Sequence, residues 1–224
     1  MRRFLLLVHR VPPDGDFSLN DLASGGGRMD EVAQAVGAAF LVSNGIRRDT
    51  ELDLLLLRDG GHGRRVHLVG ERLRYLNPDE RSTAALLKNA LVRAAGHEGR
   101  TLEASPGVFV GPGTEEDLLA FVRQPGAFWA EEGGTPLRSA SVGPEAAGVL
   151  GDVLDPTPRE RELLLASGIP RVRLGPRSLR ASQCVVLLQN ELDLREEAAP
   201  GGARAPASPG PGPGTPRGGL PATA

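Results

Sequence analysis

Short apolar runs alternate with amphipathic segments along most of the chain, and this pattern predicts strands that alternate with helices. Apolar runs bounded by turn residues are typical of buried strands; they occupy residues 4–8, 51–57, 66–69, 107–110, 127–130, 148–150 and 171–174. Segments with apolar residues every three or four positions predict helices, here at 29–40, 78–94, 114–122, 158–166 and 181–192. The alternation indicates an α/β fold with a mainly parallel sheet and helices on both faces.

Turn and cap residues set the expected ends of these elements. The pair at 44–45, Asn-Gly, is expected to close the first helix as a left-handed cap. Asn77 is expected to cap the second helix, with Pro78 in its first turn. From residue 196 onward the chain consists mainly of Ala, Gly, Pro and Ser, which cannot bury enough surface to offset the entropy of ordering. We therefore expect one folded domain over 1–195 and a disordered tail over 196–224.

Composition narrows the class of protein. The 26 basic and 28 acidic residues give a net charge of −2, which argues against coating nucleic acid through bulk charge but leaves room for a local basic site. The single cysteine excludes an internal disulfide and fits a reducing compartment. No apolar run approaches the roughly 20 residues of a membrane span, and the run at 4–8 is too short for a signal peptide. We expect a soluble, cytoplasmic protein.

Three segments carry residues that could do chemistry. Residues 27–30, Gly-Arg-Met-Asp, join a glycine loop to a helix start, which can bind an anion through free N–H groups. Residues 45–49 place two arginines beside an acid, a pattern that suits phosphate contact. Residues 175–180 follow a predicted strand, and ligands of open α/β sheets lie beyond strand ends. Taken alone, each segment could equally be an ordinary surface loop.

Other reactive residues give weaker signals. The four histidines have no metal-ligand spacing, so no metal site is expected. Cys184 has no CxxC partner and lies on an apolar helical face, where a cysteine is usually a small core residue. Serine-hydrolase, phosphate-loop, zinc-protease and dinucleotide-binding motifs are absent from the sequence.

The order of several short segments is more specific than any one of them. These segments are 21–22 with 27–30, 40–43 with 46–49, 70–73 with 78–81, 105–108, 150–152, 174–184 and 190–193. With these segments, the chain resembles the archaeal-type tRNA (pseudouridine-54 N1)-methyltransferases and their bacterial relatives, a branch of the SPOUT superfamily. The resemblance extends over residues 1 to about 194.

The resemblance implies a SPOUT fold whose C-terminal part, approximately residues 126–193, forms a trefoil knot. It also implies a homodimer that binds tRNA or another structured RNA containing pseudouridine. S-Adenosylmethionine would be the methyl donor, and no metal would take part. Carried over by position, the donor site would use Ala130, Gly151, Leu174 and Cys184.

The reaction implied by the resemblance needs a proton acceptor, because N1 of pseudouridine carries a proton. Asp30 is the candidate base, and Arg28 would act beside it. Arg47, Arg48 and Arg81 would contact the RNA.

Two positions depart from the pattern of the family. Ala130 stands where a longer apolar residue is common, and residues 153–155, Val-Leu-Asp, stand where His, a spacer and Gly are common. These departures leave a non-catalytic RNA-binding dimer open as an alternative. A SPOUT enzyme acting on a ribosomal RNA pseudouridine, and an unrelated metabolic α/β enzyme, also stay open at this point.

Overall fold

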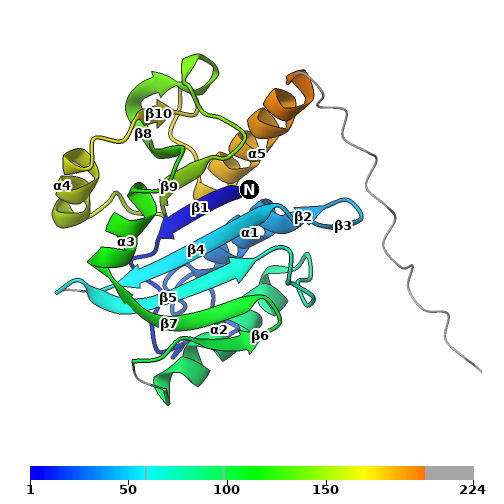
Figure 1. Ribbon diagram of the computed structural model, residues 1–224. Helices are drawn as coiled ribbons and strands as arrows, with labels where there is room; N and C mark the ends of the chain where they lie inside the picture. The colour runs from blue at the N-terminus through cyan, green and yellow to red at the C-terminus, as the bar shows by residue number, and fades with distance from the viewer. Residues whose placement is uncertain (59, 98, 200–224) are drawn as a thin grey trace, which may run out of the picture.

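The computed structural model describes residues 1–58, 60–97 and 99–199, and an eight-stranded sheet lies at its centre (Figure 1). The strand order is β10-β8-β9-β1-β4-β5-β7-β6. The bounds are β1 (Arg2–Leu7), β4 (Thr50–Leu57), β5 (His62–Val69), β6 (Leu102–Ser105), β7 (Val108–Thr114), β8 (Ala127–Pro136), β9 (Ala147–Gly151) and β10 (Arg171–Arg173). A small hairpin, β2 (Leu41–Val42) with β3 (Gly45–Ile46), lies outside this sheet.

The sheet has a parallel half and an antiparallel half. Strands β10, β8, β9, β1 and β4 pair in parallel, while β5, β7 and β6 continue the sheet as antiparallel neighbours. The prediction of a mainly parallel α/β sheet is confirmed, since four of the seven pairings are parallel. The carboxyl ends of the parallel strands meet at one edge, where ligands of such sheets bind.

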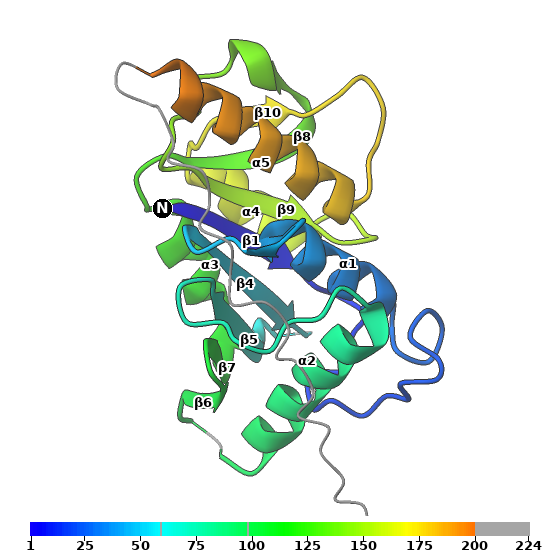
Figure 2. The same ribbon diagram turned by 90° about the vertical axis from the view of Figure 1, so that its right-hand side faces the viewer.

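Helices cover both faces of the sheet, as the sequence predicts. The helices are α1 (Met29–Phe40), α2 (Glu80–Ala95), α3 (Glu115–Val122), α4 (Pro158–Ala166) and α5 (Ala181–Ala198). Figure 2 shows α1, α2 and α5 on the face toward the viewer, with α3 and α4 behind. Two apolar clusters follow from this division: a large one beneath α1, α2 and α5, and a smaller one beneath α3 and α4.

Several predicted element ends are wrong, each because a local contact competes with the pattern. Helix α1 ends at Phe40, and the Asn-Gly pair at 44–45 lies in the β2–β3 hairpin, with Asn44 in the turn and Gly45 in β3, instead of forming a helix cap. Asp79, and not Asn77, caps α2, because its carboxylate accepts the N–H of Ser82. Helix α5 continues to Ala198, past the expected tail boundary at 196. The rest of the expected tail, from residue 200, lies outside the described residues.

A buried arginine fixes α5 to the first strand. The side chain of Arg2 is 2% exposed, and its Nη1 donates to Gln189 Oε1 at 2.9 Å and to Asp193 Oδ1 at 2.6 Å. Gln189 in turn donates to the carbonyl of Ala39 and to Thr50 Oγ1. A buried guanidinium is tolerated only with such a complete set of acceptors. The network therefore sets the position of α5 relative to α1 and the sheet.

Candidate active site at the carboxyl ends of the parallel strands

A cavity of about 770 Å³ lies where the parallel strands end. It is bordered by the ends of β1, β9 and β10, by β8, by the start of α1 and by the segment that enters α5. Its volume falls within the range of roughly 300–1,000 Å³ that is usual for small-molecule sites. The lining mixes apolar side chains, such as Leu6 and Val32, with charged groups on several sides.

All four residues expected to hold the methyl donor line this one cavity. Ala130 comes from β8, Gly151 from the end of β9, and Leu174 and Cys184 from the two sides of the 175–180 loop. They are separated by up to 54 positions in the sequence, and only the parallel pairing of β8, β9 and β10 brings them together. The 175–180 loop, predicted from its place after a strand, forms one wall.

The loop that enters α1 has a strained backbone at the cavity. Arg28 has φ +69° and is the only non-glycine residue with positive φ among those described. This conformation costs a non-glycine residue on the order of 1–3 kcal/mol, and such strain is concentrated at functional sites. Gly27 precedes it with φ +61°, and a Cβ there would lie 2.2 Å from the carbonyl oxygen of Arg10. Only glycine fits, so the backbone at 27–28 is fixed where Arg28 reaches the cavity.

Arg28 binds two neighbouring carboxylates, and only one of them lines the cavity. Its Nε and Nη2 donate to the two oxygens of Asp30 at 3.0 and 3.1 Å, and Nη2 also donates to Glu31 Oε1 at 2.6 Å. Burial raises the pKa of Asp30, but the hydrogen bonds from Arg28 outweigh it and hold that pKa below its usual value. Glu31 lines the cavity and Asp30 does not. Sequence reasoning missed Glu31 because helix periodicity alone does not show which first-turn acid faces a ligand.

His9 lies between two carboxylates, one of which, that of Asp152, lines the main cavity. Nδ1 of His9 lies 3.0 Å from Asp152, which lines the cavity, and Nε2 lies 2.9 Å from Glu160 on α4. Burial lowers the pKa of His9, but the two hydrogen-bonded carboxylates outweigh it and raise that pKa to about 9. The imidazole is therefore an imidazolium at neutral pH. It joins the ends of β1 and β9 to α4.

The 153–155 loop, which departs from the family pattern, is anchored by the same carboxylate. Asp152 accepts the backbone N–H of His9 at 2.9 Å and that of Leu154 at 2.9 Å. Val153, Leu154 and Asp155 all line the cavity. The altered residues thus still form a wall of the site.

Cys184 lies at the cavity as a protonated thiol. Burial raises its pKa to about 11, so almost no thiolate, which is the nucleophilic form, exists at neutral pH. The side chain also packs against the large apolar cluster. This placement agrees with the interpretation of Cys184 as a small apolar lining residue.

The three arginines expected to contact RNA have internal partners. Arg47 forms two hydrogen bonds to Asp193, at 3.0 and 2.6 Å. Arg81 donates to the carbonyl of Leu19 and to Asn20. Arg48 donates to the carbonyls of residues 70 and 73, and within the described residues no carboxylate pairs with it. None of the three lines the main cavity.

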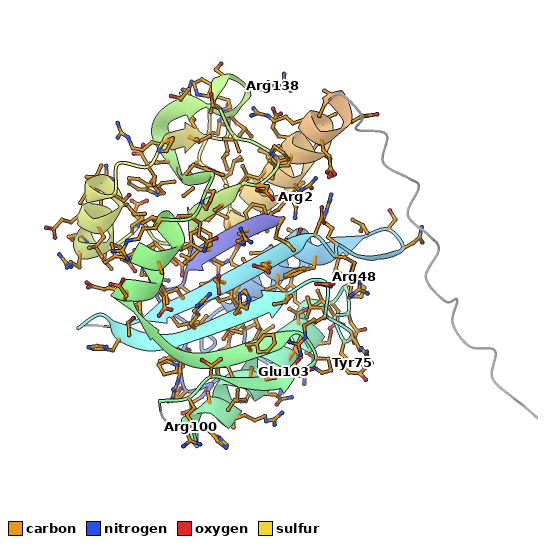
Figure 3. The ribbon with its side chains drawn as sticks, in the orientation of Figure 1. Arg2, Arg48, Tyr75, Arg100, Glu103 and Arg138 are labelled. Atoms are coloured by element: carbon orange, nitrogen blue, oxygen red, sulfur yellow. The ribbon has the colours of Figure 1, made fainter. Side chains whose placement is uncertain are left out.

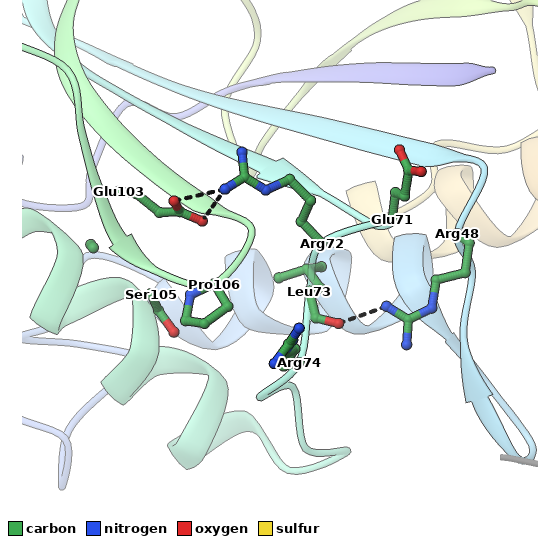
Figure 4. A pocket seen from close by; sticks show the side chains of 9 residues that line it. Arg48, Glu71, Arg72, Leu73, Arg74, Glu103, Ser105 and Pro106 are labelled. Carbon is green, nitrogen blue, oxygen red and sulfur yellow. Dashed lines mark hydrogen bonds and ion pairs between the residues drawn. The ribbon is translucent and has the colours of Figure 1, made fainter. Parts of the chain in front are cut away.

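Arg48 instead lines a second, open cavity of about 940 Å³. Figure 3 places Arg48, Glu103 and the exposed Tyr75 on the same side of the molecule. Figure 4 shows Arg72 bound to Glu103, with distances of 2.8 and 2.9 Å to the two carboxylate oxygens. Two acids and three arginines line this cavity.

The rim of the main cavity carries exposed positive charge. Arg173, Arg177 and Arg180 line it and are exposed. Within the part of the chain that the structure describes, Arg173 and Arg177 have no ion-pair partner, and Arg180 lies 3.3 Å from Glu31. Arginine guanidinium groups suit bidentate contact with phosphate. The rim is therefore better suited to contact RNA phosphates than Arg47 or Arg81.

No described helix has the length and apolar character needed to cross a membrane. No group of three or more His, Cys, Asp or Glu side chains in the described ranges is arranged to hold a metal ion.

Comparison with known proteins identifies the family to which this chain belongs. Residues 1–197 match the family described as "Putative SAM-dependent RNA methyltransferase". The chain is 38% identical to the tRNA (pseudouridine(54)-N(1))-methyltransferase of Methanosarcina mazei over 197 residues, which cover 88% of this chain and 92% of that protein. It is 39% identical to the enzyme of the same name from Haloferax volcanii, covering 86% of this chain and 96% of the relative.

A solved structure shares the fold. Archaeoglobus fulgidus Nep1, bound to S-adenosylhomocysteine, superposes with a TM-score of 0.59 at 14% identity, covering 86% of this chain and 97% of that one. At this identity the likeness concerns the fold alone.

Proposed function

Because this chain belongs to the S-adenosylmethionine-dependent RNA methyltransferase family, we propose that it methylates N1 of a pseudouridine, at position 54 of tRNA. The observation that carries the proposal is that the four expected donor residues, far apart in sequence, line one cavity together with Arg28. The relatives that share 36–39% identity over nearly the whole domain are named for this reaction.

The cavity fits an adenosine-sized methyl donor. Leu6, Val32 and Leu150 offer apolar surface for a purine ring, while the backbone at 151–156 and 174–175 offers polar groups. Ala130 leaves one wall less filled than a longer side chain would, and Cys184 adds a small thiol opposite. When bound, S-adenosylmethionine supplies a methyl group on a cationic sulfur.

The protein contributes positioning and charge, which a displacement reaction needs more than covalent help. Arg28 is held by Asp30 and by its fixed backbone, so its guanidinium is oriented before any ligand binds. At that position it can stabilise negative charge that develops on the uracil ring. The target base would have to leave its stack to reach the site.

Arginines on the rim would hold the RNA around the extruded base. Arg173, Arg177 and Arg180 are exposed at the cavity mouth, within reach of phosphates on either side of that base. Arg48, whose charge no described carboxylate balances, is a more distant contact. Arg47 and Arg81 stay predicted RNA contacts, with internal partners in the free protein.

We further propose, from the family resemblance, that the chain folds as one domain of about 195 residues with a trefoil knot over about 126–193, and that two such chains form a homodimer. A stripe of exposed apolar residues on α5 supports the dimer: Val186, Leu187 and Leu194 are 53%, 40% and 51% exposed. Val42, 45% exposed in the β2–β3 hairpin, adds to the exposed apolar surface. A second copy of the chain is the occupant we propose for this stripe, since contiguous exposed apolar surface marks interfaces.

Labelled methyl transfer to total RNA tests the proposal. The chain, incubated with labelled donor and with separated tRNA and ribosomal RNA, should yield 1-methylpseudouridine in tRNA alone. Product in ribosomal RNA would favour the alternative substrate. Binding of RNA without any binding of the donor would favour a non-catalytic dimer and would contradict the proposal.

A further inference from the structure

Glu31 has a carboxylate oxygen with no protein partner at the cavity. The side chain is 5% exposed, and its Oε2 is buried without a hydrogen-bond partner among the described residues. A buried carboxylate oxygen that accepts no hydrogen bond is unfavourable, so such a group in a native site calls for a partner from outside the chain. Glu31 lines the cavity, so a ligand bound there is the candidate for the missing donor.

The other oxygen of Glu31 is held firmly. Oε1 accepts Arg28 Nη2 at 2.6 Å and lies 3.3 Å from Arg180 Nη1. Two guanidinium groups on one oxygen keep the side chain in one orientation. Arg28 itself is fixed by its backbone and by Asp30. The position of Oε2 is therefore set before the ligand arrives.

Asp30 cannot serve in the same way. Both of its oxygens accept hydrogen bonds from Arg28, and its side chain does not line the cavity. Glu131, on the opposite wall, also has a buried oxygen without a hydrogen-bond partner, but that oxygen lies 3.8 Å from Arg171. Glu31 Oε2 is thus a cavity acceptor with no hydrogen bond or ion pair of its own among the described residues, on a side chain that Arg28 holds.

We propose that Glu31 is the catalytic residue that takes the N1 proton of the target pseudouridine. This inference rests on the proposed function. N1 forms a bond to the methyl carbon while the carbon–sulfur bond breaks and leaves its electron pair on sulfur. The N1–H bond breaks in the same step, its electron pair stays on the ring nitrogen, and the proton passes to Glu31 Oε2.

A weakly basic carboxylate suffices for this role. The N1–H group becomes more acidic as nitrogen donates its electrons to carbon, so the acceptor needs correct placement more than high basicity. The ionic contacts of Glu31 with Arg28 and Arg180 also keep a negative charge stable beside the uracil ring. Arg28 can then face O2, the carbonyl oxygen on the carbon next to N1, while Glu31 faces N1.

The test compares Glu31→Gln, Asp30→Asn and wild type in single-turnover methylation of a tRNA that carries pseudouridine 54. Donor and RNA affinities are measured separately by calorimetry. Glu31→Gln should slow methyl transfer on the bound RNA by about 10²–10⁴-fold. Its donor and RNA affinities should stay within about threefold of wild type. The residual rate should rise as pH increases, because hydroxide can then remove the proton.

Two further variants keep the result interpretable. Glu51→Gln is the matched control. Glu51 is a partly buried glutamate on β4 that forms an ion pair with Arg3, and its variant should keep the wild-type rate. Glu31→Asp retains the charge and should recover part of the rate, even if Glu31→Gln folds poorly in a thermal melt.

Four outcomes would overturn the inference. Full turnover by Glu31→Gln, or loss of turnover in Asp30→Asn alone, would assign the proton elsewhere. Loss of donor affinity in Glu31→Gln with an unchanged rate at saturating donor would show that Glu31 holds the donor instead. A wild-type chain that binds the donor but never methylates pseudouridine would contradict the proposed function, and this inference with it.

Discussion

Nδ1 of His9 lies 3.0 Å from Oδ1 of Asp152, and the backbone N–H of His9 donates to the other oxygen of the same carboxylate at 2.9 Å. Glu160 accepts from the opposite ring nitrogen at 2.9 Å. One imidazolium thus ties the first strand to the wall of the donor cavity. Its charge state controls a contact between two segments 143 residues apart.

This contact predicts a pH-dependent stability. The pKa of His9 is raised to about 9 from 6.5, so its contribution is complete below pH 6.5 and is lost as pH rises through about 9. Thermal unfolding of wild type should therefore show a falling Tm between pH 6.5 and 9.5. His9→Gln should unfold at lower temperature throughout and lose most of this slope. Parallel curves for the two proteins would contradict the assignment.

Gly27→Ala should disturb both stability and the site. The new Cβ would lie 2.2 Å from Arg10 O on a backbone with φ +61°, which predicts a loss of about 2–5 kcal/mol in the free energy of unfolding. Chemical denaturation measures the loss, and calorimetry should show weaker donor binding because Arg28 moves. Gly96→Ala is the control: a Cβ there meets nothing within 4 Å, so a change below about 1 kcal/mol is expected. Equal effects at both positions would argue against a constrained loop.

A charge on the exposed stripe of α5 should break the dimer. Val186→Glu places a carboxylate at a position that is 53% exposed in one copy and buried in the proposed dimer. Light scattering coupled to gel filtration should report a dimer for wild type and a monomer for the variant. Leu165→Glu on α4, at a site 52% exposed, should leave the dimer intact. A wild-type protein that is monomeric in solution would contradict the proposal that α5 forms a dimer interface.

Cys184 gives a labelling test of the donor site. Its thiol has a pKa raised to about 11, so at pH 8 its alkylation should be on the order of 100-fold slower than that of an ordinary thiol. It is the only cysteine of the chain, so mass spectrometry reads the site directly. S-Adenosylhomocysteine should slow labelling further, and the guanidinium-unfolded chain should react at the ordinary rate. Labelling that is unchanged by this ligand would place the donor elsewhere.

The sequence predicted the elements of the fold better than their ends. Apolar runs such as 51–57 are buried on both faces whatever their neighbours, so their pattern identified the strand at the centre of the sheet. Helix ends depend on one hydrogen bond each: the sequence predicted a cap at Asn77, but the carboxylate of Asp79 accepts the N–H of Ser82 instead. Strand β6 was missed because Leu102–Ser105 has no apolar run.

The candidate site, too, could be predicted only in part from the sequence. Family resemblance selected Ala130, Gly151, Leu174 and Cys184, and the structure brings them together. Long-range ion pairs cannot be read from a sequence pattern: Arg47 pairs with Asp193, which lies 146 residues away. The left-handed backbone of Arg28, which places its guanidinium beside Asp30 and Glu31, is not revealed by periodicity either.

The most direct measurement is nucleoside mass spectrometry of two tRNAs incubated with the chain and S-adenosylmethionine. One tRNA carries pseudouridine at position 54, and the other carries uridine there and is otherwise identical. The account predicts one equivalent of 1-methylpseudouridine in the first tRNA and no methylated nucleoside in the second. Methylation of the uridine tRNA, or the absence of 1-methylpseudouridine from the first while the donor is bound, would contradict it.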